Sequence, residues 1–114
     1  MTMTTDGTVV LDVRVSDDGG VRVVRVLGDL DVNSVNRFDR LMEDLLAGHP
    51  TTIVIDLSQV GFIDSCGLRS LITTRARVAT REALVLRAPR PATVRLLELT
   101  GLSDEFFIEG APGG

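Results

Sequence analysis

Hydrophobic and polar residues alternate in the first quarter of the chain. Residues 9–15 (VVLDVRV) and 21–28 (VRVVRVLG) follow a period of two, which is typical of half-buried strands. Between them, residues 16–20 (SDDGG) combine the residue types that favour turns. Because both runs alternate around this turn, we expect them to pair as an antiparallel hairpin, and neither contains proline.

After this hairpin the period changes to that of an amphipathic helix. The apolar positions with i, i+3 and i+4 spacing are Val35, Phe38, Leu41, Met42, Leu45 and Leu46. Asn33 or Ser34 can cap the start of this helix, and Gly48 followed by Pro50 ends it. Residues 51–57 (TTIVIDL) are then nearly all apolar or β-branched, which suits a central strand covered on both faces.

The second half of the chain alternates helices and strands. A loop over residues 58–64 leads into a second helix. The expected apolar stripe of that helix is Leu68, Leu71, Ile72, Ala76 and Ala79. Residues 83–88 form a short apolar strand, and Pro91 suits the start of a third helix that ends at Gly101 with a left-handed C-cap. Residues 105–109 are expected to form a last edge strand.

This order predicts an α/β fold with a mixed sheet of about four to five strands and about three to four helices, joined by right-handed crossovers. We expect one domain over residues 1–114, with a core at about residues 8–109, loose N-terminal residues and a loose Gly-rich tail. In such sheets functional groups gather beyond the carboxyl ends of the parallel strands. Two acidic loops, residues 28–31 and 56–64, are expected there, near the start of the second helix.

Composition narrows the class of protein. Apolar residues make up 44% and charged residues 25% of the 114 residues, which favours a packed core. The only cysteine, Cys66, cannot form an internal disulfide, which fits a reducing compartment. A net charge of −4 without a basic run argues against nucleic-acid binding. We find no signal-peptide pattern and no apolar run of about 20 residues, so we expect a cytoplasmic protein without direct membrane insertion.

Ser65, within FIDSCGL (residues 62–68), allows two interpretations. Local rules alone favour a capping or first-turn serine. The functional interpretation is an exposed hydroxyl that accepts a phosphate at the positive end of a helix, beside Asp64 and with Asp31 expected nearby. A phosphate about 6 Å from one carboxylate is repelled by roughly 4–5 kcal/mol at an effective dielectric near 20. Reversing a two-state preference takes about 5.5 kcal/mol, so one modification nearly suffices.

Catalysis by Ser65 or Cys66 would need a nearby base. The only histidine, His49, is expected at the opposite end of the sheet, so we predict no catalytic residue and no enzyme. A magnesium site is one interpretation of four acidic residues: Asp29, Asp31, Asp56 and Asp64. We favour turn and cap chemistry for them instead. Because no phosphate-loop spacing of glycines occurs either, we predict neither a metal nor a cofactor.

Three segments resemble one known family. IDLSQVGFIDSCGLRSL (residues 55–71) resembles the signature of the STAS domain, in particular that of bacterial anti-sigma-factor antagonists, in which D-S-S/T-G-L opens a helix. GDLD (residues 28–31) resembles the family's G-E/D-L-D turn. LLELTGL (residues 96–102) resembles its L-x-L-x-G-L element. These segments span most of the chain in the family's order, which agrees with the order of elements expected from periodicity.

The resemblance implies partner switching in transcription regulation, as in stress-response or sporulation systems. The unphosphorylated antagonist binds an anti-sigma factor that is also a GHKL-type serine kinase, and a sigma factor is set free. The kinase phosphorylates the serine after the motif aspartate, here Ser65, and the complex weakens. A metal-dependent serine phosphatase restores the binding form. The fold implied is that of a single STAS domain.

By the same resemblance, the residues expected at the partner-binding surface are Asp31, Asn33, Asp64, Cys66, Gly67, Leu68, Arg69 and Ile72. Cys66 departs from the family pattern, because Ser or Thr is commoner after the phosphoacceptor. This change removes a second hydroxyl and leaves a redox influence on the switch open. An alternative role is that of an unphosphorylated STAS subunit of a membrane lipid-transport complex. Such subunits often lack the Asp-Ser pair, so Asp64 and Ser65 favour the antagonist.

Overall fold

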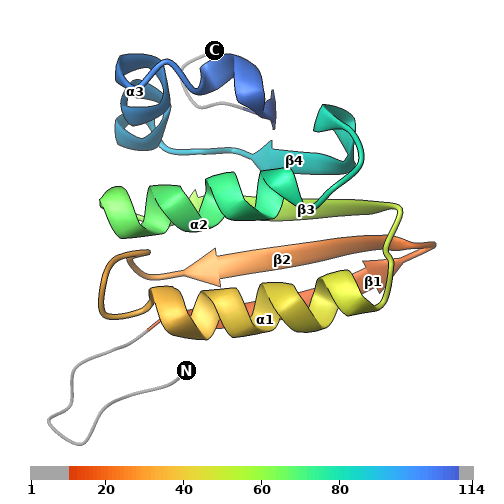
Figure 1. The fold of residues 1–114 in the computed structure, drawn as a ribbon. Helices are drawn as coiled ribbons and strands as arrows, with labels where there is room; N and C mark the ends of the chain where they lie inside the picture. The colour runs from red at the N-terminus through yellow and green to blue at the C-terminus, as the bar shows by residue number, and fades with distance from the viewer. Residues whose placement is uncertain (1–10, 111–114) are drawn as a thin grey trace, which may run out of the picture.

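A tight antiparallel hairpin begins the sheet in the computed structural model, which describes residues 11–110 (Figure 1). β1 (Asp12–Asp18) pairs with β2 (Val21–Leu27), as expected. The turn is shorter than predicted, because only Gly19 and Gly20 form it, with φ of 58° and 90°. A two-residue hairpin turn needs positive φ at its centre, which glycine adopts without strain, so the rest of the predicted turn continues β1.

Helices and strands alternate after the hairpin, as the sequence predicts. The further elements are α1 (Val35–Ala47), β3 (Thr52–Gln59), α2 (Ser65–Ala76), β4 (Leu84–Arg87), α3 (Pro91–Leu99) and β5 (Phe107–Glu109), with short 3₁₀ turns at Arg81–Ala83 and Ser103–Glu105. Pro91 is the first residue of α3, and Gly101 just beyond that helix has φ 73°. The predictions for residues 1–10 and 111–114, including the loose ends and the first residues of the core, lie outside the described residues.

The sheet has five strands in the order β1-β2-β3-β4-β5, and β2 to β5 run parallel. The strand order advances in one direction, so right-handed crossovers place all three α-helices on one face. Ile53, Ile55 and Leu57 of β3 join the core beneath these helices, whereas Val54 and Asp56 alternate with them and point to the other face. Val54 is nevertheless buried, at 4% exposure, which agrees with the expectation of a central strand covered on both faces.

The buried face of α2 also differs from the predicted stripe. Its buried residues are Gly67, Leu68, Ser70, Leu71 and Thr74. Ile72 is 40% exposed, and Ala79 lies beyond the end of the helix. The Ser70 hydroxyl donates to Asp39 Oδ1 of α1 (2.5 Å), and the Thr74 hydroxyl donates to the Ser70 carbonyl (2.9 Å). Because both hydroxyls have partners, polar residues can occupy this face, which a count of apolar residues overlooks.

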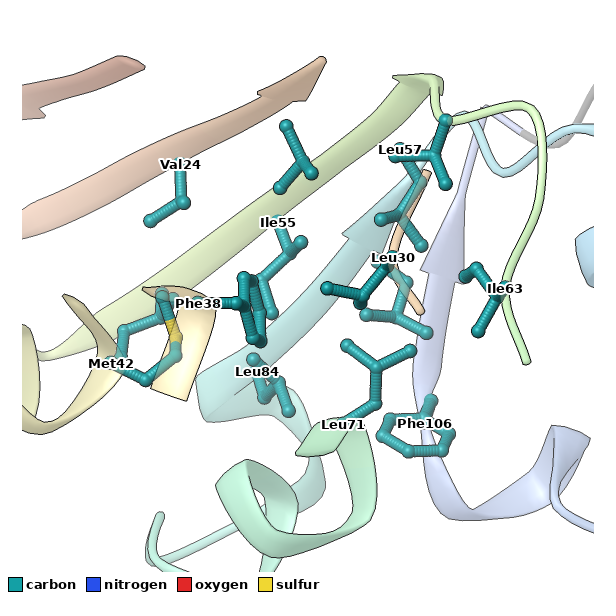
Figure 2. Packing of buried hydrophobic residues seen from close by; sticks show 14 of the residues in the cluster. Val24, Leu30, Phe38, Met42, Ile55, Leu57, Ile63, Leu71, Leu84 and Phe106 are labelled. Atoms are coloured by element: carbon teal, nitrogen blue, oxygen red, sulfur yellow. The ribbon is translucent and has the colours of Figure 1, made fainter. Parts of the chain in front are cut away.

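Two loops contribute to the core at the carboxyl ends of the central strands. Leu30, before α1, and Ile63, before α2, form an isolated parallel bridge. Their side chains point into the same core as Leu71 and Phe106 (Figure 2). The core therefore holds both loops in place at the start of α2. Among residues 11–110, no helix is long and apolar enough to cross a membrane.

Candidate partner-binding site at the start of α2

The two loops before α1 and α2 are joined by backbone hydrogen bonds. The Leu30 N–H donates to the Phe62 carbonyl (2.9 Å), and the Asp64 N–H donates to the Leu30 carbonyl (3.3 Å). These bonds extend the parallel pairing of β2 and β3 past the ends of both strands. The prediction that the two acidic loops meet near the start of α2 is confirmed.

Asp64 caps α2 and ties the two loops together. Its Oδ1 accepts a hydrogen bond from the Gly67 N–H (3.0 Å), and its Oδ2 accepts one from the Val32 N–H (2.9 Å). The Gly67 N–H, followed by that of Val32, holds the pKa of this carboxyl below its usual value, because both bonds favour the ionised form. Asp64 is thus the N-cap, and of the two local interpretations of Ser65, a capping or a first-turn serine, the structure agrees with the second.

Ser65 is the first residue of α2, and its side chain is exposed. Its hydroxyl makes no hydrogen bond to any other residue within 11–110, whereas both oxygens of the neighbouring Asp64 carboxylate accept a backbone N–H. Cys66 follows it and is half-buried. The arrangement leaves one free hydroxyl at the positive end of a 12-residue helix.

Gly67 and Leu68 lie beneath the surface rather than on it. Both are buried, and Leu68 belongs to the core. A Cβ on Gly67 would lie 2.2 Å from the Leu30 carbonyl oxygen and 3.0 Å from Ile63 Cγ2, so only glycine lets α2 start this close to the neighbouring loop. These two residues were expected at the docking surface. Because both are buried, neither presents its side-chain position to solvent.

A buried serine shapes the loop before α1. The Ser34 hydroxyl donates to the Asp29 carbonyl (2.8 Å), and its oxygen accepts from the Asp31 N–H (3.0 Å). Ser34 occupies the predicted N-cap position of α1, but its side chain makes no bond to that helix. Asp31 Oδ1 accepts from the Asn33 N–H (3.0 Å), which closes a local turn. The loop is therefore held from inside by Ser34 and from outside by Asp64.

The predicted partner-binding residues gather at one end of the molecule with different degrees of exposure. Asn33 and Arg69 are exposed, as is Ile72, and Asp31 is half-buried like Asp64 and Cys66. Sequence reasoning missed Val32 and Phe62, whose side chains are 61% and 54% exposed in these same loops. The sequence does show a large apolar residue inside each acidic loop. Neither residue continues the apolar pattern of the strand before it or of the helix after it.

The histidine and the remaining acidic residues lie in different parts of the fold. His49 lines a small hollow with Arg77 and Val78, beyond the far end of α2, which is roughly 18 Å long. Asp56 Oδ1 accepts from the Ser58 N–H (2.9 Å) and hydroxyl (2.6 Å), which is turn chemistry, as proposed for the acidic residues. Within residues 11–110, no group of three or more His, Cys, Asp or Glu side chains could hold a metal ion.

Comparison with known proteins gives consistent matches. The family described as "STAS domain" matches residues 12–111. The anti-sigma-F factor antagonist RsfB of Mycobacterium tuberculosis is 31% identical over 96 residues, which cover 84% of this chain and 79% of RsfB. The crystal structure of an anti-sigma factor antagonist from Mycobacterium paratuberculosis is 31% identical, with a TM-score of 0.82, and the match covers 97% of this chain and 92% of that one.

The same fold also occurs in a more distantly related protein with a different description. The structure of a sulfate transporter family protein from Wolinella succinogenes has a TM-score of 0.70 at 17% identity, over 96% of this chain and 86% of that one. At this identity the likeness shows the fold alone. RsfB and the protein from Mycobacterium paratuberculosis, each 31% identical to this chain, are both anti-sigma factor antagonists, so the predicted resemblance is confirmed. On the extent of these matches, the chain belongs to the STAS domain family.

Proposed function

We propose that this protein is an anti-sigma factor antagonist whose binding to the anti-sigma factor is switched off by phosphorylation of Ser65. The observation that carries the proposal is the exposed Ser65 hydroxyl at the first residue of α2, next to an Asp64 carboxylate that is already fully hydrogen-bonded. The two relatives at 31% identity, both anti-sigma factor antagonists, support the general role. The unphosphorylated protein binds the anti-sigma factor, and a sigma factor is released.

The chemistry of the switch belongs to the partners. The anti-sigma factor is a GHKL-type serine kinase, and Ser65 Oγ attacks the γ-phosphorus of its ATP while ADP leaves. The proton of the hydroxyl passes to a base on the kinase, because His49 lies at the far end of α2. A metal-dependent serine phosphatase hydrolyses the phosphoserine and regenerates the binding form. The protein itself is a substrate and a binding module in the cytoplasm, not an enzyme.

Opposing effects act on a phosphate at Ser65. The positive end of α2 stabilises it by about 0.3–1 kcal/mol. Removing the water around an ion in a protein contact costs several kcal/mol of free energy. This penalty is about an order of magnitude larger than the stabilisation that an exposed ion pair provides. Repulsion from the Asp64 carboxylate adds to this cost, since excluding water strengthens it. The phosphate is therefore tolerated by the free protein and disfavoured in the complex.

Intact-mass analysis tests the modification. Wild type and Ser65→Ala are incubated with ATP and candidate GHKL-type anti-sigma factors. We expect one added phosphate on wild type and none on Ser65→Ala. A phosphate that persists on Ser65→Ala would refute the site. No phosphate with any candidate kinase would refute the phosphorylation switch and favour a STAS subunit of a transport complex.

Charge substitutions test the effect on binding. Ser65→Ala should bind the anti-sigma factor with about the wild-type dissociation constant, because it removes an exposed hydroxyl that holds nothing in place. Ser65→Asp and Ser65→Glu should bind at least about tenfold more weakly, since each places a charge in the contact. Equal dissociation constants for all three variants, measured by calorimetry, would refute the electrostatic mechanism.

A further inference from the structure

The outer face of α2 carries an arginine one turn after Ser65. α2 lies between α1 and α3 on one face of the sheet (Figure 1), so its far side faces solvent. The exposed residues on that side are Ser65, Arg69, Ile72, Thr73 and Ala76. Within residues 11–110, the Arg69 side chain forms neither a hydrogen bond nor an ion pair. Its guanidinium is therefore available to an anion that is introduced on this face.

No carboxylate on α2 neutralises Arg69. The helix has the sequence SCGLRSLITTRA, which contains no acidic residue. The carboxylate of Asp64, the N-cap, accepts two backbone N–H groups and lies five residues before Arg69, on a different side of the helix. By contrast, Arg75 of the same helix donates from Nε to the Glu105 carbonyl (2.9 Å). Arg69 thus differs from Arg75 in having no acceptor among the described residues.

The spacing of Ser65 and Arg69 brings the guanidinium within reach of a phosphate on the serine. Residues four apart on a helix are neighbours, with Cβ atoms about 5–6 Å apart. Helical side chains lean toward the N-terminus of their helix, so Arg69 extends toward the turn that Ser65 begins. An anion four residues before a cation is also the more favourable order of the two. A phosphate on Ser65 therefore meets a cation of its own helix.

We infer that Arg69 is the internal counter-ion of a phosphate on Ser65, and that its guanidinium donates two N–H groups to the phosphate oxygens at the start of α2. The planar guanidinium matches a phosphate bidentately, and such charge-assisted bonds are roughly twice as strong as neutral ones. The inference rests on the proposed function, because it concerns the form that the kinase produces. Arg69 is a positioning residue in this form. Phosphorylation thus adds a charge at Ser65 and also engages the charge of Arg69.

Other charged groups surround the start of α2. The carboxylates on the neighbouring segments are Asp29 and Asp31 before α1, Asp39 on α1 and Asp64 before α2. They repel a phosphate and cannot donate to it when ionised. The nearest helix on the other side, α3, contains the exposed Arg95 and follows the exposed Arg90. Neither shares a helix with Ser65, so Arg69 is the cation whose distance from the phosphate is set by helical spacing.

A phosphorus NMR titration tests the pair without any kinase. Phosphoserine is incorporated at position 65 during translation, and the ³¹P resonance is followed with pH. The second pKa of phosphoserine is ordinarily about 6, and a bound guanidinium lowers it by favouring the dianion. We expect Arg69→Gln to raise this pKa by about 0.3–0.7 unit. The control Arg77→Gln removes the same charge at the C-cap, about 18 Å away, and should change the pKa by less than about 0.1 unit.

A double-mutant cycle measures the same pair through stability. Urea midpoints are compared with and without the phosphate, in the wild-type background and in Arg69→Gln. The phosphate should lower the midpoint more in Arg69→Gln than in the wild-type background, because the variant leaves the phosphate without its cation. The unmodified proteins should have similar midpoints, since Arg69 is exposed. Arg69→Lys should restore part of the effect, because an ammonium keeps the charge but lacks the planar fork.

The outcomes separate this inference from the proposed function. A phosphate pKa that Arg69→Gln leaves unchanged would refute the pair. A rise with Arg90→Gln or Arg95→Gln as large as that with Arg69→Gln would also refute it, because the cation would then come from the α3 side. Neither result bears on whether Ser65 is the switch. The proposed function fails instead if no candidate kinase modifies Ser65, or if the phosphate leaves binding to the anti-sigma factor unchanged.

Discussion

The two ends of the parallel sheet are built differently. At the carboxyl ends of the strands, two loops are joined to each other through Leu30, and the Asp64 carboxylate bonds the backbone of both. At the amino ends, connections are local turns, such as Gly19–Gly20 and the turn at His49 with φ 51°. There, the N–H and the hydroxyl of Thr51 both donate to the Gly20 carbonyl (3.0 Å each).

This difference shows where the chain maintains a defined surface. At the Ser65 end, side-chain and backbone hydrogen bonds fix the two loops. The hydroxyl of Ser65 and the side chains of Val32 and Phe62 are exposed to solvent. A surface that is already ordered loses less conformational entropy when a partner binds. The Ser65 end is therefore suited to recognition, whereas the other end mainly reverses the direction of the chain.

Gly67→Ala should have the largest effect, because it forces the two loops apart. Its Cβ would lie 2.2 Å from the Leu30 carbonyl oxygen, which belongs to the backbone and cannot rotate away. We expect a loss of about 1–3 kcal/mol or more in the free energy of unfolding, measured with urea, together with weaker anti-sigma binding.

Gly61→Ala is the matched control for Gly67→Ala. Its Cβ would lie 3.4 Å from Asp29 Oδ1, an ordinary contact with a side-chain atom of the loop before α1. We expect a change within about 0.5 kcal/mol. Equal destabilisation by both alanines would contradict the account of the close approach at Gly67.

Asp64→Asn should destabilise the protein less, in a way that depends on pH. Asparagine has one acceptor oxygen, so one of the two N–H groups now bound, that of Gly67 or that of Val32, loses its partner. Because the pKa of Asp64 is lowered by folding, its contribution is complete above the unfolded pKa of about 3.9 and is lost as pH falls through the lower folded value. The urea midpoint of wild type should therefore exceed that of Asp64→Asn at pH 7.

The difference between wild type and Asp64→Asn should shrink as the pH falls below about 4. Asp29→Asn is the control at an exposed position on the neighbouring loop. Its midpoint should stay close to that of wild type over the same pH range. A midpoint difference between wild type and Asp64→Asn that is independent of pH would show that the ionised carboxylate does not hold the loops.

His49→Asn should have the smallest effect and tests the other end of the sheet. Asparagine tolerates positive φ, so the turn at 51° is kept while the imidazole is removed. Phosphorylation of Ser65 by the kinase and binding to the anti-sigma factor should both stay within about twofold of wild type. A loss of phosphorylation with normal binding would mean that His49 takes part in the transfer, contrary to the separation of the two ends.

Periodicity predicts the order of elements and the meeting of the acidic loops, because these depend on which residues along a segment are apolar. The cap of α2 could not be assigned in this way. Asp64 and Ser65 are both good N-caps, and the choice depends on the Val32 N–H, which is 32 residues away in sequence. The burial of Ser70 and Thr74 likewise depends on partners found only in the fold.

Periodicity also could not predict that the side chains of Val32 and Phe62 are exposed. An apolar residue within a loop can point into the core, as Leu30 and Ile63 do, or into water. Only the register of the two loops decides between these directions. Sequence motifs therefore indicated Ser65 and its acidic setting, while the exposure of Val32 and Phe62 beside it required the structure.

Affinity of the anti-sigma factor for the two forms of this protein tests the central claim most directly. Wild type is phosphorylated stoichiometrically, verified by mass, and its dissociation constant is compared by calorimetry with that of unphosphorylated wild type and Ser65→Ala. We expect the phosphorylated form to bind at least about a hundredfold more weakly, and the other two to bind alike. Equal affinity of the phosphorylated and unphosphorylated forms would contradict a switch at Ser65.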